Sequence, residues 1–97
     1  MSEGTAADGP RDGEAPLKFP CVFPIKVMGA NDAQFERRVI DLVTPHVGTL
    51  SSTSVTSRES RNGRFLSVTV TVIAESRAQL DDIYRSLTGS EHVLFVI

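Results

Sequence analysis

The stretch that decides the fold reads FPCVFPIKVMG, from Phe19 to Gly29. Its large apolar residues recur at every second position, the period of a strand with one buried face: Phe23, Ile25 and Val27. We therefore expect a strand at about Val22–Met28, ending at the glycine. Proline cannot donate to a ladder of strand hydrogen bonds, so Pro24 is expected at the first position of this strand.

A helix is expected directly after this strand, capped by Asn31 or Asp32. Pro45 cannot lie in a regular helix without loss of a hydrogen bond, so the helix should weaken there and stop by Gly48. The apolar residues at helical spacing form one buried stripe: Phe35, Val39, Leu42, Val43 and Val47.

A hairpin is expected in the middle of the chain. Its first strand, about Leu50–Glu59, is rich in Ser and Thr and suits the edge of a sheet. Arg61–Arg64 contains Asn-Gly, which favours the positive φ angles of a tight type I′ turn. The second strand, Phe65–Ala74, alternates most regularly. Its apolar residues share one face: Leu66, Val68, Val70 and Val72.

A second helix is expected to begin at Ser76, with Gln79 completing a capping box, and to end before Gly89. Its buried stripe comprises Leu80, Ile83, Tyr84 and Leu87. The last strand, His92–Ile97, is apolar apart from its histidine.

The resulting order is βαββαβ, which predicts an α+β ferredoxin-like sandwich, a four-stranded antiparallel sheet with two helices on one face. The first and third strands should be central, and the second and fourth should be edges. An edge as apolar as the last strand is expected to be covered or to pair with another chain, for example in a homodimer.

Composition gives one domain at 17–97, with 40% hydrophobic and 23% charged residues in the whole chain. Residues 1–16 are acidic, with a net charge of −3 (four carboxylates and one arginine), and have no large apolar residue after Met1, which predicts a disordered tail. The remaining residues carry about +1, which disfavours a nucleic-acid binder. No signal peptide or membrane span is evident, so a cytoplasmic location is expected.

The single cysteine, Cys21, excludes an intrachain disulfide, and no Cys/His grouping has metal spacing. We therefore predict no metal and no cofactor. No arrangement of nucleophile and base, and no pair of carboxylates, marks a catalytic site, so no catalytic residue is assigned.

The chain also resembles a known family. Phe19-Pro20, Phe23 and Lys26-Val27-Met28-Gly29 are similar to the opening of the YbeD-like family of bacterial proteins of unknown function. Gly63, Ser67-Val68 and the closing strand Val93–Ile97 extend the resemblance over residues 17–97. It implies a ferredoxin-like fold similar to the ACT regulatory domains that sense amino acids, and it implies no established activity.

An ACT-like module would bind a ligand between the first strand and the first helix, here at Gly29, Ala30, Asn31 and Asp32. Small residues allow close backbone approach, and a helix N-terminus offers free N–H groups to a carboxylate. A purely structural role, as a turn and a cap, explains the same residues.

An interaction surface is predicted on the sheet face opposite the helices and at the hairpin. Its open-face members are low in charge and partly apolar. Three arginines around the hairpin, Arg58, Arg61 and Arg64, could hold a phosphate or an acidic partner. Plain solvation of this face is the alternative. The residues are Lys26, Met28, Arg61, Arg64, Phe65 and Thr69.

The sequence therefore favours a non-enzymatic regulatory or binding module for a small metabolite or a partner enzyme. An RRM-like RNA-binding domain has the same strand order, but it would need more aromatic residues on the open face. An acylphosphatase-like hydrolase would need a cationic phosphate cradle in the first loop, which has no arginine before Arg37.

Overall fold

The computed structural model describes residues 18–48 and 54–97. The predicted tail at 1–16 and the first residues of the second expected strand lie outside the described residues. The elements follow the predicted order: β2 (Cys21–Ala30), α1 (Phe35–Val47), β3 (Val55–Glu59), β4 (Phe65–Ala74), α2 (Arg77–Thr88) and β5 (Val93–Val96).

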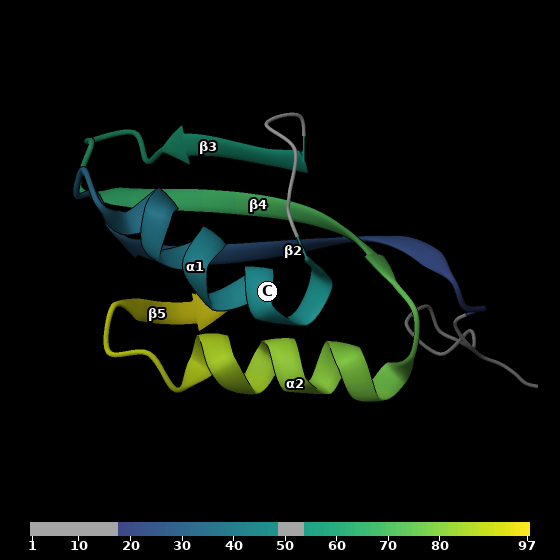
Figure 1. Ribbon diagram of the computed structural model, residues 1–97. Coiled ribbons are helices and arrows are strands. Elements are labelled where there is room, and N and C mark those ends of the chain that lie inside the picture. Colours follow the sequence, from purple (N-terminus) through teal and green to yellow (C-terminus); the bar gives the residue numbers. More distant parts are fainter. Residues whose placement is uncertain (1–17, 49–53) are drawn as a thin grey trace, which may run out of the picture.

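The four described strands form one antiparallel sheet in the order β3-β4-β2-β5. Figure 1 shows α1 and α2 side by side across the same face of this sheet. The predicted ferredoxin-like α+β fold is confirmed, as are the central positions of β2 and β4 and the edge positions of β3 and β5.

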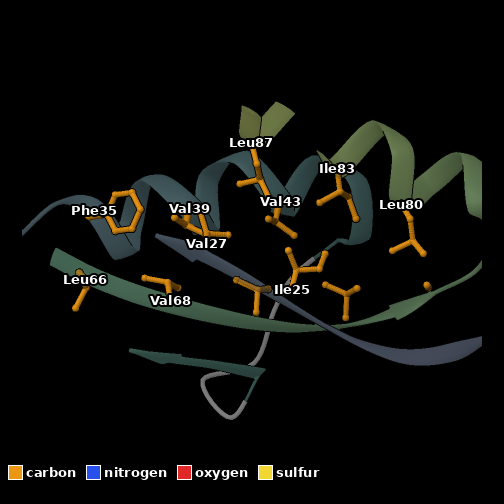
Figure 2. Close-up of a cluster of buried hydrophobic side chains, with 13 residues drawn as sticks. Ile25, Val27, Phe35, Val39, Val43, Leu66, Val68, Leu80, Ile83 and Leu87 are labelled. Carbon is orange, nitrogen blue, oxygen red and sulfur yellow. The ribbon is translucent and has the colours of Figure 1, made fainter. Parts of the chain in front are cut away.

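The core lies between the two helices and the sheet. Figure 2 shows side chains of α1 and α2 pointing toward those of β2 and β4. Every second residue of β4 from Leu66 to Ala74 is buried, which confirms the predicted alternation. Fully buried side chains come from both layers: Phe35, Val39 and Val43 of α1, Ile83 and Leu87 of α2, and Ile25, Val27, Val68 and Val70 of the sheet.

The prediction for Pro24 is wrong, because Pro24 is an interior residue of β2 and lies opposite Thr71. Ile97 N–H donates to the Lys26 carbonyl, so the backbone polar groups of Lys26 point toward β5. Alternate residues of a strand point the same way, and the nitrogen of Pro24 therefore faces this edge too. Strand β5 ends at Val96, opposite Val27, so in the described residues this strand does not reach the level of Pro24 and needs no donor from it.

Helix α1 begins slightly later than expected. Its N-cap is Gln34, and Asp32 instead closes the preceding turn, where its Oδ1 accepts a hydrogen bond from Gln34 N–H at 2.6 Å. The helix continues through Pro45 to Val47 and ends at Gly48, which has φ +79°. The predicted end is confirmed, although regular helix does not stop at the proline.

The hairpin between β3 and β4 is confirmed, but its turn is wider than the predicted two-residue turn. Gly63 N–H donates to the Ser60 carbonyl at 2.9 Å, so Arg61 and Asn62 are the central residues of the turn. Gly63 follows with φ +73°. The Asn62 side chain accepts from Arg64 N–H and from the Ser60 hydroxyl, both at 3.0 Å, and these bonds favour the wider loop.

Helix α2 is capped by Ser76 as predicted, since its hydroxyl accepts a hydrogen bond from Gln79 N–H at 3.1 Å. The Gln79 side chain accepts from Glu75 N–H, one residue before the cap, so the second bond differs from that of the predicted capping box. It ends before Gly89, whose φ of −79° is an ordinary right-handed value. Within residues 18–48 and 54–97, neither helix has the length and apolar character that crossing a bilayer requires.

Candidate functional site

The sheet face opposite the helices is not covered by any element of the described part of the chain. Alternate residues of β2 and β4 that are not in the core project from it, and strand pairing aligns them across the sheet. As predicted from the alternation, they share one face: Lys26 and Met28 of β2, and Phe65, Ser67, Thr69, Thr71 and Ile73 of β4. We call this surface the open face.

The open face has two adjoining hollows beside β3, of about 390 and 340 Å³. They share Arg58 and Ser67, which lie opposite each other in the β3–β4 pairing, so the two hollows form one groove. We call it the basic groove. It is lined by Lys26, Met28, Thr56, Ser57, Arg58, Glu59, Ser60, Arg61, Phe65, Ser67 and Thr69.

The basic groove contains positive charge that has no partner in the described residues. No carboxylate of those residues lies within ion-pair distance of Lys26, Arg58 or Arg61, whereas Arg37 and Arg85 pair with aspartates of their own helices. Glu59 is the only acidic residue among the lining residues. The lining thus has three cations, Lys26, Arg58 and Arg61, against one carboxylate. The groove is therefore suited to an anion.

Most of the predicted interaction surface lies in this groove. The structure brings together Lys26, Met28, Arg61, Phe65 and Thr69, whereas Arg64 is exposed but does not line it. Of the three arginines that the sequence groups around the hairpin, Arg58 lines both hollows. The available signal was the alternation of the polar strand, which places Arg58 and Thr56 on the same face.

The predicted ligand corner is closely packed around Gly29. A Cβ added there would overlap the Phe35 ring and lie 2.6 Å from the His92 carbonyl oxygen. Gly29 is buried, while Ala30 beside it is exposed and paired with Phe65. Glycine is thus required at this position for the close approach of strand, helix and the loop before β5.

The other two corner residues are bonded within the fold. Asn31 N–H donates to the Arg64 carbonyl at 3.0 Å, and the Asn31 side-chain amide donates to the Gly63 carbonyl at 2.8 Å. Asp32 accepts from Gln34 N–H, as described above. These contacts fix the hairpin against the start of α1. The ligand role of Gly29, Ala30, Asn31 and Asp32 stays a prediction.

The histidines lie away from the basic groove. His46 Nε2 is 2.9 Å from the Ser86 hydroxyl, and the Gln79 side chain donates to the His46 carbonyl, so this residue links α1 to α2. His92 Nε2 lies 3.8 Å from the Glu91 carboxylate at the surface. The part of the chain that the structure describes contains no group of three or more potential metal ligands.

Comparison with known proteins places the chain in a family. Residues 14–97 match the family described as "Protein of unknown function (DUF493)". A UPF0250 protein of Chromobacterium violaceum is 46% identical over 81 residues, which cover 84% of this chain and 91% of the relative. A UPF0250 protein of Neisseria gonorrhoeae is 43% identical over 81 residues, 84% and 89% of the two chains. One of Paraburkholderia phytofirmans is 42% identical over 84 residues, 87% and 94%.

Among solved structures, the solution structure of protein HP0495 from H. pylori is similar, with a TM-score of 0.69. The two chains are 15% identical, and the similarity covers 93% of this chain and 96% of HP0495, so it supports the fold alone. These matches confirm the resemblance to the YbeD-like family: the chain belongs to the DUF493, or UPF0250, family of bacterial proteins of unknown function.

Proposed function

We propose that this protein is a non-enzymatic binding module that holds an acidic segment of a partner protein in the basic groove. The observation that carries the proposal is the set of three cations without a described counter-charge: Lys26, Arg58 and Arg61. Arginine binds carboxylates through paired N–H donors, and such charge-assisted bonds are stronger than neutral ones.

The shape of the groove favours a polypeptide segment as its occupant. Its lining extends along β4 from Phe65 to Thr69, a length of about 13 Å at the strand rise, which accommodates an extended segment of about four residues. Hydroxyl groups of Ser67 and Thr69 can bond to the backbone of such a segment. Met28 and Phe65 offer apolar contact at the hairpin end.

The lining residues support binding rather than catalysis. They include no histidine or cysteine, and Glu59 is the only carboxylate among them. A single-stranded RNA would need aromatic platforms for its bases. Phe65 is the only aromatic residue of this lining, so an acidic peptide fits it better than RNA does.

The proposal is tested with the full chain and a fluorescent octaglutamate peptide as the probe. In the Arg58→Gln/Arg61→Gln variant, we expect the affinity to fall by roughly tenfold or more, since two charge-assisted contacts are lost. The matched control, Arg38→Gln/Arg77→Gln, removes the same charge from the helices and should bind nearly as tightly as the unchanged protein.

Three results would contradict the proposal. Equal loss of affinity in the two double variants would mean that only net charge matters. Unchanged affinity in Arg58→Gln/Arg61→Gln would exclude the basic groove as the site. Tighter binding of a single-stranded oligonucleotide than of the peptide, at matched salt, would favour nucleic acid instead.

A further inference from the structure

The open face carries a second surface, which is apolar and lies beside the basic groove. The large side chains exposed there are Val22 at 70%, Ile73 at 61%, Ile97 at 65% and Phe95 at 48%. Together with exposed Pro24 they form what we call the apolar band. The basic groove lies toward β3 and the hairpin, whereas the apolar band runs from β5 across β2 to Ile73, near the end of β4 away from the hairpin.

Strand pairing shows that the residues of the apolar band are neighbours. Val22 lies opposite Ile73, and Phe95 lies opposite Met28, which places both pairs on the open face. Ile97 N–H bonds to the Lys26 carbonyl, so Ile97 projects from the same face as Phe95, two residues before it.

Pro24 lies between the two parts of the apolar band, Val22 on one side and Ile97 on the other. It follows Val22 by two residues on β2 and precedes Lys26, the residue opposite Ile97, by two. Diagonal neighbours across a sheet are about 7–8 Å apart, within reach of large side chains. The apolar band is therefore a continuous diagonal surface across β5, β2 and the end of β4.

We propose that the apolar band is the contact surface of a homodimer, in which two copies pack their open faces together about a twofold axis. Each copy would offer roughly 500 Å² of apolar surface, and two copies reach roughly 1,000 Å², the lower end of specific interfaces. The largest apolar patch of a typical monomer is about 300–600 Å² and is often functional, so the size of the apolar band is that of an interaction surface.

The occupant is a second copy rather than the N-terminal segment of the same chain. Residues 1–17 contain only Met1 and Leu17 as large apolar residues, and the segment is acidic, so it cannot supply a matching apolar surface. A twofold contact requires a surface that is complementary to itself. The apolar band has no charged member, so two copies can meet without like charges in contact, whereas the basic groove would place like charges against each other.

Face packing is favoured over pairing of β5 edges. The register between β2 and β5 shifts between Met28 and Gly29, where Leu94 is the extra residue of β5. Such a bulge twists an edge away from a new strand partner. Only Val93–Val96 forms the strand at this edge, which leaves few backbone groups for pairing.

The test is sedimentation equilibrium of the full chain from micromolar to millimolar concentration. We expect the average mass to rise from 10.5 kDa toward twice that value. In the Ile73→Thr/Ile97→Thr variant, dimerisation should weaken by roughly tenfold or more, because four exposed apolar side chains per dimer are lost. The control Ala78→Thr, on the exposed side of α2, should dimerise like the unchanged protein.

If Ile73→Thr/Ile97→Thr fails to fold, NMR of the unchanged protein at falling concentration tests the same interface. Amide NMR shifts of the unchanged protein on dilution should be largest at Val22, Ile73, Phe95 and Ile97. A mass that stays at 10.5 kDa up to millimolar concentration overturns the proposal, as do dilution shifts confined to the helices. Arg58→Gln/Arg61→Gln should still dimerise, which separates this inference from the acidic-peptide proposal.

Discussion

Gly29 is the residue at which the sheet, the first helix and the loop before β5 come closest together. In Gly29→Ala the new Cβ overlaps the Phe35 ring and the His92 carbonyl oxygen, so the free energy of unfolding should fall by about 1–3 kcal/mol. Urea denaturation measures this loss. Gly89→Ala is the control, because Gly89 has φ −79° and its nearest atom, the Arg85 carbonyl oxygen, is 3.1 Å from the added Cβ. Equal stability of the two variants would contradict this account of the corner.

The ionisation of Tyr84 can be followed by its ultraviolet absorbance without interference, because the chain has one tyrosine and no tryptophan. Burial raises the pKa of the Tyr84 hydroxyl above its ordinary value of 10.0. The contribution of Tyr84 to stability is therefore complete below pH 10 and is lost as the pH rises through the higher folded pKa. Ultraviolet titration should give a midpoint above 10 in the folded protein and near 10 in urea. The same midpoint in both would show that the hydroxyl is solvated in the fold.

Helix α1 tolerates Pro45 at a cost, because the proline leaves the carbonyl four residues earlier without its helical donor. Pro45→Ala supplies this N–H, which stabilises the helix, but it also increases the conformational entropy of the unfolded chain. The net free energy of unfolding should rise by about 1–2 kcal/mol. Thermal denaturation of dilute protein measures the change. Pro24→Ala is the control, since its new N–H would face an edge without a strand partner. A larger gain at Pro24 than at Pro45 would contradict the assignment.

The elements themselves were largely predictable, because burial on one face produces regular patterns in the sequence. Alternation predicted β4 and its buried face, and helical spacing predicted the stripes of α1 and α2. The position of Pro24 was not predictable, since it depends on where β5 ends beside β2. The hairpin was also misjudged, because side chains of Ser60 and Asn62 bond across the loop and favour a wider turn than Asn-Gly alone.

At the scale of the whole molecule, the candidate site was predictable in part. Lys26, Met28, Phe65 and Thr69 share a face because of their spacing within strands. The sequence grouped Arg58 with the hairpin arginines, but its place in the groove required the β3–β4 register, which sets it opposite Ser67 and beside both hollows. A polar strand such as β3 has a weak pattern of its own, so its register comes from the partner strand.

The same scale shows how the open face is divided. Cations without described counter-charges lie toward β3, and exposed apolar side chains lie toward β5 and the start of β2. On the helices, Arg37 and Arg85 are paired with aspartates, whereas Arg38 and Arg77 lie far apart on α1 and α2 without an ion pair in the described residues. The open face therefore differs from the helical face in that its unpaired cations lie together in one groove, beside a band of exposed apolar side chains.

The most direct measurement is a backbone amide NMR titration of the full chain with the octaglutamate peptide. Binding in the basic groove predicts that the largest shifts fall at Arg58, Ser67 and Thr69, and that added salt reverses them. Shifts confined to Ala30–Asp32 and the helices, or no shifts at millimolar peptide, would contradict the claim that the open face binds an acidic segment.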